Sequence, residues 1–119
     1  MARVLLVGYI AELLQEPERL FRAAGYDVTV TTSLIDTLNA IEQNPFDAAV
    51  LGFSIPETER NQLATALKDA SQSCQIIMMY FASLKNTELA DALMPTGASN
   101  EEVLRAVNHI LSKTQSRLA

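Results

Sequence analysis

Short apolar runs alternate with longer stretches of helical periodicity along the whole chain. The runs lie at residues 3–7, 27–31, 47–51, 75–79 and 92–94. Most of them lack polar alternation, which is typical of strands buried on both faces of a parallel sheet. Because parallel strands need right-handed crossovers, the pattern predicts an α/β protein with helices on both faces of the sheet. Five such units fit a flavodoxin-like, doubly wound sheet with strand order 2-1-3-4-5.

The ends of several predicted helices are marked by specific residues. The stretch from Glu12 to Ala24 has helical periodicity that places Leu13 and Phe21 on one side, with Pro17 tolerated only in the first turn. Ser33 is expected to cap a second helix, and Pro56 precedes a third. The segment Ser99-Asn100-Glu101-Glu102 predicts a capping box that opens the last helix, with Val103 and Val107 facing inward.

The connection after the fourth strand is short. It leaves room for about two helical turns around Lys85 to Ala90, so the fourth helix is expected to be shortened or missing.

Length and composition set the remaining limits. A chain of 119 residues has room for one core, so residues 1–119 are expected to form a single domain. The formal net charge of −5 argues against non-specific nucleic-acid binding. The single cysteine, Cys74, cannot form an internal disulfide, and no apolar run is long enough for a membrane span. We therefore expect a soluble cytoplasmic protein.

In the order and spacing of its segments, the chain resembles the receiver domains of bacterial response regulators, the CheY-like family. The resemblance covers nearly the whole sequence, and no single motif carries it. Its carriers are Val4-Leu5-Leu6-Val7, Ala23-Ala24-Gly25-Tyr26, Phe46-Asp47-Ala48-Ala49-Val50-Leu51, Pro56, Ile76-Ile77-Met78-Met79 and the stretch from Gly97 to Leu104.

The resemblance also implies a set of site positions. A working receiver carries two acids after the first strand for magnesium, a carboxylate nucleophile after the third, a hydroxyl after the fourth and a lysine after the fifth. These positions correspond here to Gly8 and Tyr9, Gly52, Tyr80, and Thr96. Glycine cannot be phosphorylated, and no acid remains to bind the metal. Only the fold and the signalling context are therefore carried over, and the sequence predicts a degenerate pseudo-receiver.

The resulting functional hypothesis is a regulatory module that acts by protein–protein interaction, independently of phosphorylation, in a two-component-like system. No enzymatic activity, cofactor, metal, nucleic acid or membrane is expected. The partner would be a regulator, kinase or effector. Receivers commonly dimerise through the fourth helix, fifth strand and fifth helix, so a shortened fourth helix makes a homodimer through that side a second expectation.

The predicted rim at the strand ends is aromatic and apolar, not acidic. Its residues are Tyr9, Ile10, Phe53, Ile55, Tyr80, Phe81, Met94 and Pro95. Ligands of open α/β sheets usually bind at this end, so the rim is a candidate docking surface. Two alternatives remain open. In the first, the Tyr80 ring fills the gap left by Gly8 and Gly52, because close packing disfavours an empty hole. Alternatively, the domain senses a small apolar or aromatic molecule there.

Other candidate residues favour simpler interpretations. His109 is the only histidine and shares the outer helix face with Glu102 and Arg105, which predicts a solvated side chain. Asp47 begins its strand and therefore lies at the wrong end of the sheet to be a phospho-acceptor. Residues 57–60 are expected to form a solvated loop or helix start. A flavin-binding domain of the same topology is disfavoured, since no phosphate-cradling loop follows the first strand.

Overall fold

The computed structural model describes residues 2–80 and 89–118. Its five strands form one all-parallel sheet in the order β2-β1-β3-β4-β5. The strands are β1 (Arg3–Val7), β2 (Asp27–Thr31), β3 (Ala48–Leu51), β4 (Gln75–Tyr80) and β5 (Ala92–Pro95). The predicted fold class and strand order are confirmed. The register of the three central strands aligns Val7 with Leu51 and Leu51 with Met78, so their carboxyl ends lie side by side.

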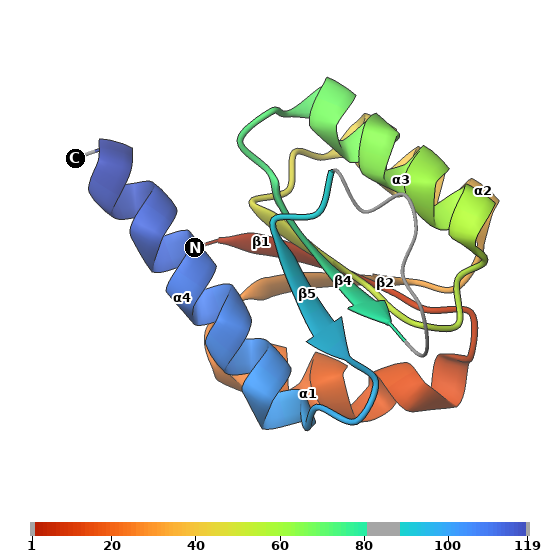
Figure 1. The fold of residues 1–119 in the computed structure, drawn as a ribbon, viewed down its shortest axis with the longest axis horizontal. Helices are drawn as coiled ribbons and strands as arrows, with labels where there is room; N and C mark the ends of the chain where they lie inside the picture. Colours follow the sequence, from red (N-terminus) through yellow and green to blue (C-terminus); the bar gives the residue numbers. More distant parts are fainter. Residues whose placement is uncertain (1, 81–88, 119) are drawn as a thin grey trace.

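Helices cover both faces of this sheet (Figure 1). One face carries α2 (Leu34–Gln43) and α3 (Glu57–Ala70). The other carries α1 (Gln15–Ala23), preceded by the 3₁₀ helix η1 (Ala11–Leu14), and α4 (Asn100–Leu118). None of the helices in the described ranges combines the length and apolarity needed to cross a bilayer.

Alternating side chains of the strands build two cores, one on each face. Leu5, Val7, Ala49, Leu51, Ile76 and Met78 pack toward α2 and α3. Val4, Leu6, Ala48, Val50 and Ile77 pack toward α1 and α4, where they meet Phe21, Val103, Val107 and Leu111. Each central strand is therefore buried on both faces, which explains its unbroken apolar sequence.

The helix ends largely follow the sequence signals. The Asp36 backbone N–H donates to Ser33 Oγ over 3.2 Å. At α4 both halves of the capping box form, since Glu102 N–H donates to Ser99 Oγ (3.1 Å) and Ser99 N–H donates to Glu102 Oε1 (3.3 Å). Pro17 lies in the first turn of α1, as expected.

The chain before α1 differs from the prediction. Residues 11–14 form η1 instead of continuing the α-helix, and Leu13 is 52% exposed, although periodicity placed it on the buried side. A 3₁₀ turn holds about three residues, so the direction of its side chains does not continue that of α1. Of the helix expected around Lys85 to Ala90, Leu89 and Ala90 are not helical, and the rest lies outside the described residues.

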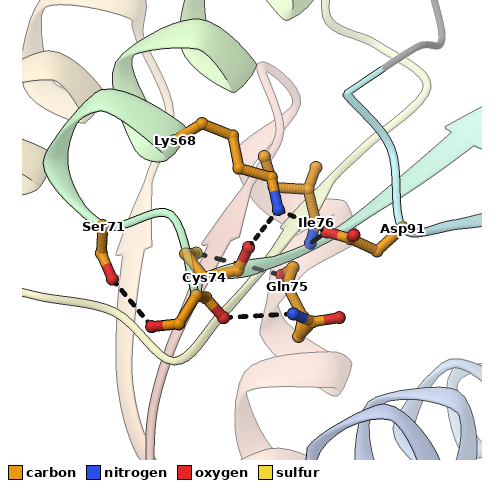
Figure 2. Close-up of polar contacts among 7 residues, drawn as sticks. Lys68, Ser71, Cys74, Gln75, Ile76 and Asp91 are labelled. Carbon is orange, nitrogen blue, oxygen red and sulfur yellow. Dashed lines mark hydrogen bonds and ion pairs between the residues drawn. The ribbon is translucent and has the colours of Figure 1, made fainter. Parts of the chain in front are cut away.

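Polar contacts at the amino ends of the strands fix the start of β5 (Figure 2). The Asp91 carboxylate accepts from Ile76 N–H (2.7 Å) and pairs with Lys68 Nζ (2.8 Å). Lys68 also donates to the Cys74 carbonyl (2.7 Å), and Asp91 N–H donates to the Ile76 carbonyl (2.7 Å). One side chain from α3 thus joins the residue before β4 to the residue before β5.

Candidate functional site: an uncharged pocket at the carboxyl ends of the strands

Glycines follow two of the three central strands. Gly8 follows β1 and Gly52 follows β3. Because side chains alternate between the faces along each strand, positions 8 and 52 fall on the face that carries α1 and α4. A Cβ on Gly8 would lie 3.3 Å from a methyl group of Leu14, which is flexible. A Cβ on Gly52 would lie 2.9 Å from the Val7 carbonyl oxygen, which is backbone and accepts from Gly52 N–H. Position 52 therefore has no room for a side chain unless β1 and β3 separate.

A pocket of about 220 Å³ opens beside these glycines. Its inner wall consists of buried residues of the α1 and α4 face, namely Leu6, Phe21, Val50 and Val103. Leu14, Pro17, Met79 and Ala98 complete the walls. Ile10, Leu13 and Phe53 also line it and are 42%, 52% and 37% exposed, so they lie where the pocket meets solvent. The pocket is a continuation of the core that reaches the surface.

None of the described residues that line this pocket carries a charge. Its polar side chains are those of Ser54, Thr96 and Asn100. Ser54 Oγ accepts a hydrogen bond from Tyr9 N–H (2.9 Å) and, as a hydroxyl, retains a proton to donate. Such a lining suits a neutral molecule and offers no counter-charge to a phosphoryl group.

Tyr9 turns away from the pocket toward α3. Its ring packs against the core on the α2 and α3 face, and its hydroxyl donates to Glu59 Oε1 over 2.8 Å. Partial burial, followed by the hydrogen bond and the negative charge of Glu59, raises the pKa of Tyr9 to about 12. The residue at the second expected acid position thus serves as a neutral link between the end of β1 and the first turn of α3.

The other residues of the predicted rim are distributed differently. Ile10 and Phe53 lie at the opening of the pocket, Pro95 is exposed and Met94 is half-buried. Ile55 was wrongly assigned to the rim, because it is 3% exposed and belongs to the core under α3. The chain turns between Gly52 and Ile55, whose N–H donates to the Gly52 carbonyl, and this turn directs Ile55 inward. Phe81 and the Tyr80 side chain lie outside the described part of the structure.

The candidates set aside earlier lie away from the pocket. Asp47 accepts from Arg3 N–H (2.8 Å) at the amino end of the sheet. His109 is exposed on α4 together with Glu102 and Arg105. Residues 57–60 begin α3, and Arg60 is buried instead of solvated as we expected. Within residues 2–80 and 89–118, no three His, Cys, Asp or Glu side chains are grouped closely enough to hold a metal ion.

Comparison with solved structures shows which known folds this one is similar to. The chain superimposes on a CheY-like receiver domain protein from Methanospirillum hungatei with a TM-score of 0.87, at 21% identity over 98% of both chains. It is similar to the signal receiver domain of a putative LuxO repressor from Vibrio parahaemolyticus (TM-score 0.83, 15% identity, 98% and 94% covered). The fold is that of a receiver domain.

A third neighbour of the same fold is the response regulator TrrA of Thermotoga maritima in complex with Mg²⁺ and BeF (TM-score 0.79, 16% identity, 92% of this chain and 99% of that chain covered). No protein-family model matches the sequence. No curated protein matches it either. The likeness to receiver domains is thus evident in the fold, and neither of the two sequence comparisons finds a match.

Sequence reasoning identified Gly8 and Gly52 but missed most of the residues around them. Leu13, Leu14 and Val103 line the pocket although the sequence indicates only helix positions for them. The available signal was the pair of glycines at equivalent strand ends, which leaves a gap that the neighbouring helix ends must border. The structure brings Thr96 to the same pocket, as the resemblance to receivers implied.

Proposed function

We propose that this chain is a receiver-fold regulatory module that acts through protein–protein contacts and without phosphorylation. The observation that carries the proposal is the backbone at Gly52. Aspartyl phosphate formation requires a carboxylate nucleophile at the end of the third strand. Here that position has no side chain, and the Val7 carbonyl oxygen lies 2.9 Å from where a Cβ would be.

The surroundings of Gly52 support the same proposal. Magnesium prefers hard oxygen ligands, and the transferred phosphoryl group needs its charge neutralised. The described lining of the pocket offers neither carboxylates nor cations. An acid restored at position 52 alone would therefore lack both the metal and the positive charge that phosphoryl transfer requires.

The context of two-component signalling is inferred from the fold that the chain shares with response regulator receivers. A module of this kind would contact a regulator, kinase or effector. The edge strand β5 exposes Leu93, which is 42% accessible, and Pro95. An edge strand presents unpaired backbone groups to another chain, so the β5 side is the surface that we propose for self-association.

The test is phosphorylation itself. The purified protein is incubated with acetyl phosphate and magnesium, and its intact mass is measured. In parallel, light scattering on a sizing column compares samples with and without magnesium and beryllofluoride. We expect no phosphoryl adduct and the same molar mass in both samples. The Thermotoga maritima regulator, which was solved with Mg²⁺ and BeF, is the positive control.

Either of two results would overturn the proposal. A phosphoryl adduct on any residue would show that another acceptor exists. A change of mass on adding beryllofluoride would show that the anion is bound and alters assembly. A dimer mass that is unaffected by the mimic would agree with constitutive self-association through the β5 side, and Leu93→Lys should then produce monomers.

A further inference from the structure

We infer that the pocket beside Gly8 and Gly52 is a binding site for a small, uncharged and mainly apolar molecule, such as an aromatic ring with one hydrogen-bonding group. Its meaning as a regulatory input rests on the function proposed above. Its capacity to bind a ligand does not, because binding depends only on the size, lining and accessibility of the pocket.

The size of the pocket suits one ring system. An apolar cavity of about 150 Å³ is enough to hold benzene. At about 220 Å³, this pocket has room for a ring somewhat larger than benzene. The deep wall is rigid, since Leu6, Phe21 and Val50 are each 6% exposed or less. A pocket whose walls are already packed needs little reordering to accept a ligand.

The chemistry of the lining selects against charge. Transferring an ionised group into an apolar site without a partner costs far more than any contact there returns. The described lining contains no charged side chain, whereas Ser54 and Asn100 offer hydrogen-bonding groups. This combination of apolar walls and a few polar groups is typical of small-molecule sites. A neutral ligand is therefore favoured over a phosphate or carboxylate of the same size.

The walls come from several elements of the fold. Leu13 belongs to η1, Phe21 to α1, and Val103 to the first turn of α4, while Gly8 and Gly52 end two central strands. A molecule in the pocket would contact all of them at once. Its binding energy is then available to hold α4 and η1 against the sheet, which is the type of coupling that a ligand-responsive module needs.

Indole serves as the neutral probe and benzoate as a charged ring of similar size. Binding is measured by ¹H–¹⁵N chemical-shift titration of the full chain. We expect saturable shifts with indole that are centred on Leu6, Val50 and Val103, and binding of benzoate that is weaker by about a hundredfold. Acetyl phosphate labelling is run on the same preparation, so that the phosphorylation-independent function is tested separately.

Two variants and one control test the location of the site. Ala98→Leu fills the pocket and should weaken indole binding by about tenfold or more. Ala66→Leu adds the same atoms at a half-buried site in a shallow groove between α2 and α3, and should leave binding unchanged. Leu13→Lys changes a residue that is already 52% exposed, so it should fold normally and weaken binding at the opening.

The proposal fails if indole causes no saturable shifts, if benzoate binds as tightly as indole, or if Ala98→Leu and Leu13→Lys, both folded by circular dichroism, bind indole like the wild type. If indole does not bind and no phosphoryl adduct forms, the proposal of a ligand site is wrong and the proposed function stands. Indole binding together with a phosphoryl adduct would support the ligand site and overturn the proposed phosphorylation-independent function.

Discussion

The amino ends and the carboxyl ends of the strands differ in where the charged side chains lie and where a pocket is left. At the amino edge, Asp27, Asp47 and Asp91 lie at the starts of three strands and are engaged by Arg3 or Lys68, or by backbone N–H groups. At the carboxyl ends, β1 and β3 are followed by glycine beside a pocket whose described lining carries no charge. Working receivers need their acids at the carboxyl ends. In this chain the acids at the sheet edges stabilise the fold, and the pocket is left to apolar contacts.

The largest effect is expected from placing an acid where receivers have one. Gly52→Asp adds a Cβ 2.9 Å from the Val7 carbonyl oxygen and a carboxylate beside an apolar pocket. We expect the free energy of unfolding to fall by about 3 kcal/mol or more, without any gain of phosphorylation. Urea denaturation measures the change. Gly97→Asp is the matched control, because a Cβ there has no neighbour within 4 Å, and it should be nearly neutral. Equal stability of both variants would contradict the close approach of β1 and β3.

A somewhat smaller loss is expected at the amino edge. Asp91→Ala leaves Ile76 N–H without its carboxylate acceptor and Lys68 without its ion pair. We expect a loss of about 2 kcal/mol in denaturant unfolding. Asp91→Asn keeps an acceptor but removes the charge, so it should recover about half of that loss. If Asp91→Ala unfolds like the wild type, the network does not hold β5.

The dependence of stability on alkaline pH tests the burial of Cys74, which lies at the same amino ends of the strands. Burial raises the pKa of this thiol from 9.0 to about 12. The folded state therefore keeps the proton while the unfolded chain loses it, so stability is complete below about pH 9 and falls as the pH rises toward 12. We expect a slope of up to about 1.4 kcal/mol per pH unit in the wild type. The slope should be shallower by this amount in Cys74→Ala. Parallel stability curves for the two proteins would mean that the thiol titrates normally.

The smallest effect is expected next to the pocket. Tyr9→Phe removes the hydroxyl that donates to Glu59, which should cost about 1 kcal/mol because the acceptor is charged. Tyr26→Phe deletes the same atom where the partner is the neutral amide of Asn108, and it should cost less. Thermal unfolding of the two variants side by side gives the comparison. A larger loss for Tyr26→Phe would show that Tyr9 does not link β1 to α3.

The fold was predictable from the sequence because its main signals are local. Unbroken apolar runs such as Val4 to Val7 report burial on both faces, and Ser99 with Glu102 reports a helix start. The site was less predictable, because its lining is assembled from several elements. The turn that sends Ile55 inward and the 3₁₀ geometry that exposes Leu13 both depend on tertiary packing, which periodicity does not encode.

The carboxylate of Asp91 has one more consequence. By accepting from Ile76 N–H while its own N–H donates to the Ile76 carbonyl, Asp91 sets the register of β5 at the strand's first step. The position of the edge strand β5 is thus fixed at its start, by contacts of Asp91 with Lys68 of α3 and Ile76 of β4.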